Sequence, residues 1–159
     1  MSILYTNADC LTNKLQELKV RISLYATKPQ IISITEVKHK HKWNYNLSEL
    51  NIEGYNMFTN DFNQDTRGII TYVSNVINCK QIQFHKGFKE YLLLELRTDN
   101  LSKLTVGTIY RSPNSTTEND EKLLDAIECF SKSHRDNMLL LGDFNWPDKL
   151  AILDYYQSK

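Results

Sequence analysis

Apolar and polar residues alternate along the chain in blocks that predict both helices and strands. Two segments repeat apolar residues every three or four positions, which is the pattern of an amphipathic helix. The first runs from Leu11 to Tyr25 and ends before Lys28-Pro29, and the second runs from Glu118 to Phe130. Short apolar or β-branched runs predict strands at residues 2–6, 30–35, 55–59, 68–74, 77–84, 91–97, 104–110 and 138–141.

The order of these elements predicts an α/β fold. A strand, a helix and a second strand open the chain, which indicates a βα unit packed on a sheet. The strands between residues 55 and 110 follow one another without helices, and this favours antiparallel pairing. A third helix is expected to begin within residues 148–156. The sequence shows no linker, internal repeat or second domain, so we expect residues 1–159 to form a single domain.

Composition narrows the class of protein. The 159 residues carry 19 basic and 19 acidic side chains, and this balance argues against tight non-specific nucleic-acid binding by the whole surface, although not against a local basic patch. Cys10, Cys79 and Cys129 lack metal-site spacing and are expected to be small buried hydrophobes in an intracellular, reducing compartment. No signal peptide is visible and no apolar run approaches the ~20 residues of a membrane span. We therefore expect no membrane association, and no obligate protein partner can be identified.

Polar side chains occur at or just past the carboxyl ends of several predicted strands. Five residues hold such positions: Asn7, Glu36, Tyr110, Asp143 and Asn145. Each has an ordinary interpretation as a turn, cap or edge residue. If the strands share a sheet edge, however, all five side chains converge on one cleft.

A cleft with these groups suits metal-assisted cleavage of a phosphoester. Mg²⁺ prefers oxygen ligands and uses one or two protein carboxylates, so Glu36 is a candidate ligand. The ion would polarise a phosphate oxygen. Asp143 would orient the attacking water or accept its proton. Tyr110 and Asn145 are neutral donors suited to phosphate oxygens.

The motifs around these residues occur in the order used by a known superfamily. They are Thr6-Asn7-Ala8-Asp9, Ile-Thr-Glu36-Val, Arg67-Gly68-Ile-Ile-Thr-Tyr-Val, Ile-Tyr110-Arg111-Ser-Pro113 and Leu-Gly142-Asp143-Phe144-Asn145. In these motifs and their order, the chain resembles the endonuclease/exonuclease/phosphatase superfamily. It looks closest to the endonuclease domains of non-LTR retrotransposons, which accompany a reverse transcriptase. The Tyr-Arg-x-Pro and Gly-Asp-Phe-Asn segments are typical of that branch, and the resemblance spans essentially the whole chain.

The resemblance implies a fold, a set of roles and a substrate. The fold is a four-layer α/β sandwich of two mixed β-sheets flanked by helices. Asn7 and Glu36 match the family's metal-site residues, for Mg²⁺ or alternatively Mn²⁺, and Tyr110 matches its phosphate-contacting tyrosine. Asp143 and Asn145 match the pair that activates water and holds the scissile phosphate. The substrate would be DNA, and the protein would be nuclear if it acts on chromosomal DNA.

The chain departs from the family pattern after Gly-Asp-Phe-Asn. The family continues with a late acid that completes the metal site and with a Ser-Asp-His-like motif, and nothing in this sequence matches them. All four histidines precede Asp143. The resemblance therefore implies a C-terminally truncated copy of a retrotransposon endonuclease, with weak or no activity.

Basic residues leave further alternatives open. Lys38, Lys40 and Lys42 lie beside Glu36 and either track a phosphate backbone or form a solvated loop. Arg111 either reaches DNA phosphates or forms a surface salt bridge. Two other functions also stay open: a non-catalytic remnant that at most binds nucleic acid, and a phosphatase acting on a small phosphoester. The Tyr-Arg-x-Pro segment and the basic stretch favour DNA over a small phosphoester.

Overall fold

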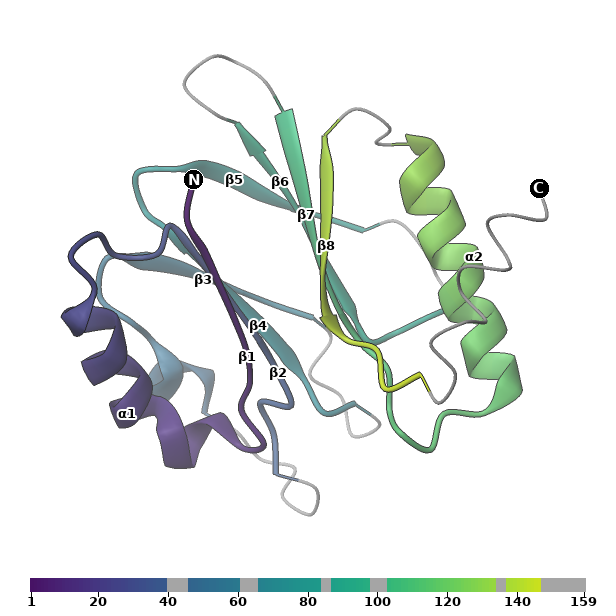
Figure 1. Cartoon of the computed structure of the whole chain (residues 1–159), viewed down its shortest axis with the longest axis horizontal. Helices are drawn as coiled ribbons and strands as arrows, with labels where there is room; N and C mark the ends of the chain where they lie inside the picture. Colours follow the sequence, from purple (N-terminus) through teal and green to yellow (C-terminus); the bar gives the residue numbers. More distant parts are fainter. Residues whose placement is uncertain (40–45, 61–65, 84–86, 98–102, 134–136, 147–159) are drawn as a thin grey trace.

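Two mixed four-stranded β-sheets lie face to face, and one long helix covers the outer face of each (Figure 1). The computed structural model describes residues 1–39, 46–60, 66–83, 87–97, 103–133 and 137–146. The strands of the first sheet are Ile3–Asn7 (β1), Ile31–Thr35 (β2), Tyr55–Thr59 (β3) and Ile69–Ser74 (β4), in the order β1-β2-β4-β3. Those of the second sheet are Asn78–Ile82 (β5), Tyr91–Arg97 (β6), Lys103–Tyr110 (β7) and Met138–Asp143 (β8), in the order β5-β6-β7-β8.

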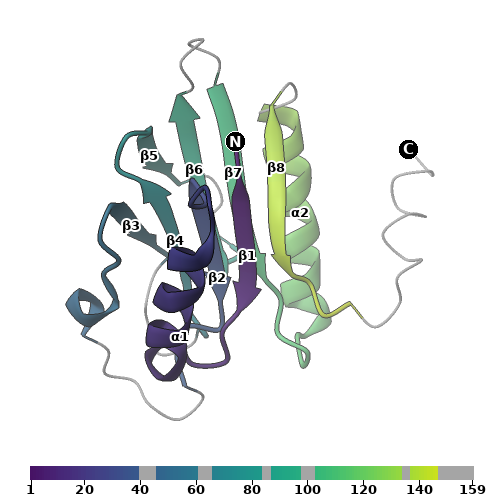
Figure 2. The ribbon, with the colours of Figure 1, turned by 60° about the vertical axis from the view of Figure 1, so that its left-hand side comes forward.

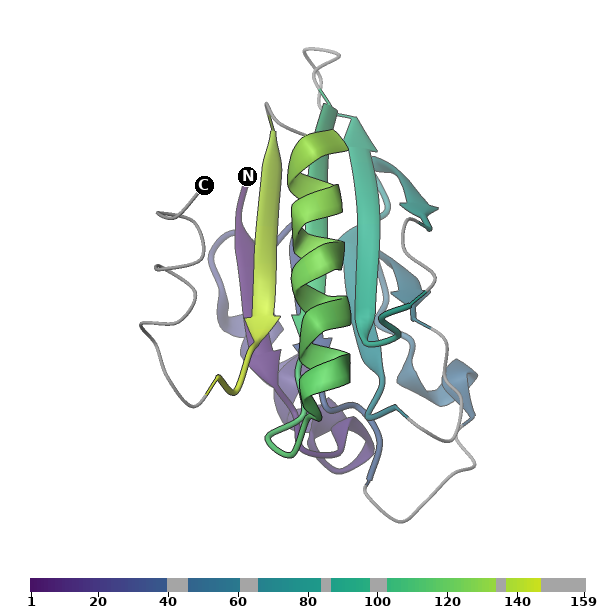
Figure 3. The same cartoon turned by 90° about the vertical axis from the view of Figure 1, so that its right-hand side faces the viewer.

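Each sheet contains one parallel pair whose two strands are connected by a helix. The helix α1 (Leu11–Leu24) links β1 to β2, and α2 (Thr117–Ser133) links β7 to β8. The remaining described pairs are antiparallel. The strands β1 and β8 are edge strands, and Figures 2 and 3 show them side by side on one flank of the sandwich. The carboxyl ends of the two parallel pairs therefore lie close together.

Three apolar layers hold the sandwich together. The buried face of α1, which includes Leu15 and Leu18, packs on the outer face of the first sheet. The buried face of α2, which includes Leu123 and Phe130, packs on the outer face of the second sheet. The layer between the sheets consists of Ile31, Ile69, Val73, Leu92, Leu94, Leu96, Val106 and Tyr110. This arrangement confirms the expected α/β sandwich of four layers.

The buried layer between the sheets also contains a small polar network. The hydroxyls of Ser33 and Thr71, from the first sheet, lie 3.2 Å apart. The hydroxyl of Thr108, from β7, lies 3.0 Å from Ser33 and 3.2 Å from Thr71. Each hydroxyl thus finds partners away from water, which a buried polar group requires.

The observed strands extend further than predicted at the two edges that carry the polar residues. The predicted strand 138–141 ends before Gly142, but β8 continues to Asp143, and β1 includes Asn7. The reason is that Gly142 stays paired with Ile109 by adopting a φ of +152°, so the ladder runs past the apolar segment. A short 3₁₀ helix, Leu47–Leu50, was not predicted. The third helix expected within residues 148–156 lies outside the described residues.

The cysteine prediction is only partly correct. All three thiols are free; Cys10 is buried, Cys79 is partly buried and Cys129 is exposed. Cys129 lies on α2 but off the face that packs against the sheet, which is why the expectation of burial is wrong for it. None of the helices in the described ranges is long and apolar enough to cross a membrane.

A carboxylate also joins the two sheets close to the ends of the parallel pairs. Glu90 directly precedes β6, and its Oε1 accepts a hydrogen bond of 2.8 Å from the backbone N–H of Arg67, just before β4. Burial raises the pKa of Glu90 from 4.5 to about 7, although the Arg67 N–H and the charges of Lys38 and Arg67 oppose the rise. The folded chain therefore binds a proton at Glu90 more tightly than the unfolded chain does.

This raised pKa gives a pH dependence of stability. The contribution of Glu90 to the free energy of unfolding is complete below pH 4.5 and is lost as the pH rises through about 7. The reason is that only the unfolded chain then ionises this carboxyl group without a desolvation penalty. We expect Glu90→Gln, which keeps an uncharged acceptor for the Arg67 N–H, to flatten the decline in the free energy of unfolding between pH 5 and about 8. Urea unfolding across this range measures the slope, and an identical slope in the variant would contradict the assignment.

Gly142 provides a test of the β7–β8 register. A Cβ at this position would lie 1.9 Å from the backbone oxygen of Ile109, so Gly142→Ala forces the strands apart. We expect a loss of about 3 kcal/mol, or roughly 6–12 °C in Tm. Gly54→Ala is the matched control, since Gly54 has a φ of +85° but no atom within 4 Å of the added Cβ. It should lose only about 1 kcal/mol, and equal losses in the two variants would argue against this register.

Candidate active site

Three side chains from different strands meet at the carboxyl ends of the parallel pairs. Asn7 is the last residue of β1, Glu36 directly follows β2, and Asp143 is the last residue of β8. The amide nitrogen Nδ2 of Asn7 donates to Oε1 of Glu36 at 2.8 Å and to Oδ2 of Asp143 at 2.9 Å. One amide group therefore bridges two carboxylates, one from each sheet.

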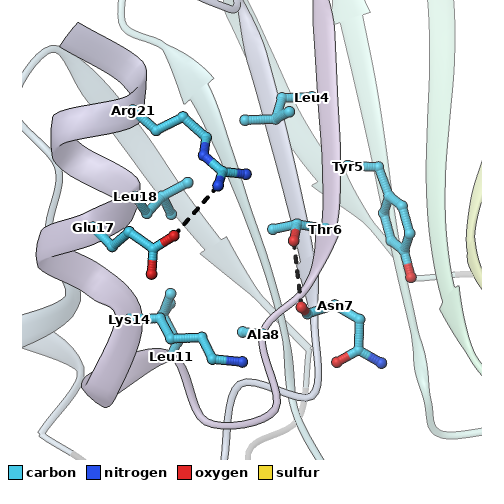
Figure 4. Close-up of a pocket in the computed structure, with 10 residues that line it drawn as sticks. All are labelled: Leu4, Tyr5, Thr6, Asn7, Ala8, Leu11, Lys14, Glu17, Leu18 and Arg21. Atoms are coloured by element: carbon cyan, nitrogen blue, oxygen red, sulfur yellow. Dashed lines mark hydrogen bonds and ion pairs between the residues drawn. The ribbon is translucent and has the colours of Figure 1, made fainter. Parts of the chain in front are cut away.

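The backbone orients Asn7 for this contact. The Oδ1 atom of Asn7 accepts the N–H of Asp9 at 3.0 Å, so its amide nitrogen faces the carboxylates. Tyr5 lies two residues earlier on the same face of β1, and Figure 4 shows both side chains on the opposite side of the strand from Leu4 and Thr6. The alternation of side chains along a strand thus sends Asn7 towards β8.

A cavity lies on the other side of β1 from this cluster. It has a volume of about 110 Å³ and lies between β1 and α1, where Leu4, Leu11 and Leu18 contribute to its wall (Figure 4). Lys14 also lines it, whereas the side chain of Asn7 points away from it. The cavity is therefore separate from the two carboxylates.

Unusual backbone conformations concentrate around the cluster. Among the described residues, the non-glycine positions with positive φ are Asp9 (41°), Cys10 (85°), Glu36 (53°) and Asn145 (43°). They lie in the segments that follow β1, β2 and β8, next to the three side chains described above. Such conformations cost energy and persist where the surrounding structure fixes them, which is frequent at functional sites.

Tyr110 lies beside Asp143 at the same edge. It is the last residue of β7, it pairs with Asp143 in the sheet register, and it is buried. Burial raises the pKa of its hydroxyl, and the negative charge of Glu36 and a hydrogen bond with Glu36 raise it further. The phenol therefore remains protonated at neutral pH and can donate a hydrogen bond.

Tyr5 is a second protonated phenol at the site. Its hydroxyl lies 2.9 Å from the hydroxyl of Thr35. Burial raises its pKa, and the charges of Asp143 and Glu36 act in the same direction. Tyr5 was not among the predicted site residues, although its position two residues before Asn7 placed it on the same face of the strand.

Arg67 forms an ion pair with Glu36. Its Nη2 lies 2.6 Å from Oε2 of Glu36 and 2.8 Å from Oδ1 of Asp9. Its Nε donates to the backbone oxygen of Lys38 at 3.1 Å. The Arg67-Gly68 motif was recognised in the sequence, but no role was predicted for Arg67, because its acidic partners are distant along the chain.

Asn145 does not join the cluster through a hydrogen bond. Its Nδ2 donates to the backbone oxygen of Arg111 at 2.9 Å. In return, the guanidinium of Arg111 donates to the backbone oxygen of Asn145. These two bonds hold the segment after β8 against the segment after β7. Asn145 therefore lies next to the site, and one N–H of its amide group is bonded to the carbonyl of Arg111.

Arg111 is buried instead of lying on the surface. Its side chain is only 4% exposed, and its Nε and Nη2 donate to the two carboxylate oxygens of Asp120 at 2.7 and 2.8 Å. The guanidinium also lies over the ring of Trp146, 4.7 Å from the centroid. This geometry matches neither of the two expectations for Arg111, because the residue forms a buried ion pair that fixes the start of α2 near the end of β8.

The basic stretch after Glu36 is described only at its beginning. Lys38 is 2% exposed and close enough to Glu90 to influence its pKa. The Lys38 side chain therefore faces the interior, so it neither belongs to a solvated loop nor lines a surface groove. Lys40 and Lys42 lie outside the described residues.

The donor set fits a small divalent cation. Within the described residues no group of three or more His, Cys, Asp or Glu side chains could hold a metal. Mg²⁺, however, needs only one or two carboxylates and retains several waters. Oε1 of Glu36 and Oδ2 of Asp143 both contact the positive end of the Asn7 amide dipole, which marks the point where a cation would face both oxygens.

Comparison with known proteins shows that the chain shares its fold with solved structures. No protein-family model and no curated protein matches the chain. Among solved structures, the endonuclease domain of TRAS1, a telomere-specific non-LTR retrotransposon, aligns with a TM-score of 0.62 and 15% identity. The alignment covers 92% of this chain and 59% of that chain, so the chain spans about three fifths of the length of the TRAS1 domain.

Two further solved structures share the fold. An endonuclease/exonuclease/phosphatase family protein from Bacteroides thetaiotaomicron aligns with a TM-score of 0.64 and 12% identity over 99% of this chain and 68% of that one. ANGEL2, a 2′,3′-cyclic phosphatase, aligns with a TM-score of 0.62 and 14% identity over 95% of this chain and 48% of that one. The chain therefore has the four-layer α/β fold of the endonuclease/exonuclease/phosphatase superfamily.

Proposed function

We propose that the protein is a phosphoesterase-type hydrolase that cleaves DNA phosphodiesters with the help of Mg²⁺. The observation that carries the proposal is the bridge from the Asn7 amide to both Glu36 and Asp143, at 2.8 and 2.9 Å. Arg67 is the shared counter-ion of Asp9 and Glu36, so the group of Asp9, Glu36 and Asp143 retains negative charge, which a divalent cation would offset. Glu36 is assigned to hold the ion, and Asn7 would join it only by turning its Oδ1 from the Asp9 N–H towards the ion.

The remaining groups have distinct chemical tasks. Bound Mg²⁺ supplies Lewis-acid polarisation of a phosphate oxygen. Asp143 orients the attacking water and accepts its proton, because its Oδ2 faces the same point as Glu36. Tyr110 stays protonated and donates to a phosphate oxygen. Asn145 uses one of its two amide N–H groups on the carbonyl of Arg111, and the second would donate to the phosphate.

DNA is the proposed substrate because the Tyr-Arg-x-Pro and Gly-Asp-Phe-Asn segments are typical of retrotransposon endonucleases. The buried positions of Lys38 and Arg111 supply no phosphate-binding surface, so they do not support this choice. A small phosphoester is the second candidate, since ANGEL2 shares the fold and is a 2′,3′-cyclic phosphatase. A protein that binds DNA without cleaving it is the non-catalytic alternative.

Nicking of supercoiled plasmid in Mg²⁺ or Mn²⁺ tests the proposal directly. We expect metal-dependent nicking that chelation with EDTA stops. Asp143→Asn should reduce the rate by about 10²–10⁴-fold, because it removes the group that accepts the proton. Glu36→Gln should reduce it by about 10²–10³-fold, in line with the loss of one charge-stabilising group. Glu53→Gln is the matched control, since Glu53 is exposed in the turn before β3.

The outcomes separate the three functions. Hydrolysis of adenosine 2′,3′-cyclic phosphate without plasmid nicking would favour the small phosphoester. Retention of plasmid in a gel-shift assay without hydrolysis of either substrate would favour the non-catalytic alternative. Activity that survives both Glu36→Gln and Asp143→Asn would place the chemistry elsewhere in the chain.

A further inference from the structure

Arg67 connects its own segment before β4 with the segments that follow β1 and β2. It precedes β4, and its guanidinium reaches the segment after β1 through Asp9 and the segment after β2 through Glu36. A reciprocal pair of bonds strengthens the second link: Nε of Arg67 donates to the oxygen of Lys38 at 3.1 Å, and the N–H of Lys38 donates to the oxygen of Arg67 at 2.8 Å. The side chains of Arg67 and Glu36 are 15% and 13% exposed, so their contact is largely shielded from solvent, whereas the side chain of Asp9 is 73% exposed.

The two oxygens of Glu36 have different partners. Oε2 lies 2.6 Å from Nη2 of Arg67, whereas Oε1 lies 2.8 Å from Nδ2 of Asn7. The carboxylate is therefore held at both ends, with one oxygen turned to the arginine and the other to Asn7 and Asp143. Glu36 also has a φ of +53°, a conformation that a glutamate rarely adopts unless the surroundings fix it.

We propose that Arg67 is a positioning residue for Glu36, and that by holding Oε2 it keeps Oε1 available to a divalent cation. This inference rests on the proposed function, because it assigns Glu36 to the metal. Arg67 itself touches neither the metal position nor the phosphate in this arrangement. Its effect passes through the orientation of one carboxylate.

A simple counter-ion would have the opposite effect. A guanidinium that only neutralised Glu36 would repel the incoming cation, and its removal would then tighten cation binding. Positioning predicts weaker binding on removal, because the Glu36 side chain is only 13% exposed and a buried carboxylate that loses its partner turns towards water, away from the cation. The two roles of Arg67 therefore differ in the sign of the change in affinity.

The geometry favours the positioning role. Arg67 uses Nε for the Lys38 oxygen and Nη2 for two carboxylates, which requires the planar, forked guanidinium group. A lysine has one nitrogen at the end of a flexible stem and cannot make these contacts together. Groups that orient a metal ligand in this way typically contribute about 10–100-fold to metal affinity.

Direct measurement of Mn²⁺ binding tests the inference. The loss of the free-ion electron paramagnetic resonance signal reports the Kd of the 159-residue chain without any need for turnover. We expect Arg67→Ala to raise the Kd by about 100-fold and Arg67→Lys, which keeps the charge, to raise it by about 10-fold. Arg21→Ala is the control, because Arg21 forms an exposed ion pair with Glu17 on α1, and it should leave the Kd unchanged.

Thermal unfolding identifies the variants that remain folded, and if Arg67→Ala does not fold, Arg67→Lys decides the result. An unchanged or lower Kd in folded Arg67→Lys overturns the positioning role, provided that the parent chain binds Mn²⁺ and Glu36→Gln removes that binding. Failure of the parent chain to bind Mn²⁺ saturably overturns the metal site itself, and this inference with it. The two failures are therefore distinguishable in one titration series.

Discussion

The contact between the Asn7 amide and the carboxylates of Glu36 and Asp143 depends on every layer of the fold. It joins the ends of β1, β2 and β8, and thus the two sheets, through a single polar group. Two carboxylates that both lie within hydrogen-bond distance of one amide group would repel each other unless a donor or a cation lay between them. The remaining features of the site either bring these three residues together or compensate their charge.

The sheet topology brings the residues together. A parallel pair requires a crossover, and here each crossover is a helix that covers the outer face of its own sheet. Both parallel pairs lie at the same flank, so their edge strands β1 and β8 are neighbours across the sandwich (Figure 2). Gly142 then allows β8 to stay paired through its last residue, which places Asp143 beside Tyr110 in the register.

Sequence patterns predicted the elements well because local periodicity reflects which face of each element is buried. The spacing of Leu11, Leu15, Leu18 and Ile22 corresponds to the buried face of α1, and the isoleucine-rich run of β2 corresponds to a strand buried on both faces. The resemblance to a known family also indicated Asn7, Glu36, Tyr110 and Asp143, and the structure brings these four close together. Asn145 lies beside them, but a hydrogen bond to the main chain occupies one N–H of its amide group.

The charged residues were harder to interpret because their environment depends on distant parts of the chain. Arg111 follows a strand and precedes a proline, a position typical of a surface loop, yet Asp120 and Trp146 enclose it. Lys38 belongs to a basic stretch, yet it is buried near Glu90. No local pattern distinguishes a buried cation from a solvated one, since the difference lies in an acid contributed by another element.

The local charge balance at the site matters more than the net charge of the whole chain. The whole chain is neutral, with 19 residues of each sign, but acids gather at the ends of the parallel pairs. Arg67 is shared between Asp9 and Glu36, so one guanidinium serves two carboxylates, whereas within the described part of the chain the side chain of Asp143 bonds to the neutral Asn7 amide and forms no ion pair. Burial has already shifted Glu90 towards its protonated form at the edge of this cluster, which reduces the local negative charge without a further cation. The two carboxylates bridged by Asn7 therefore remain the part of the site where an additional positive charge would be most strongly stabilised.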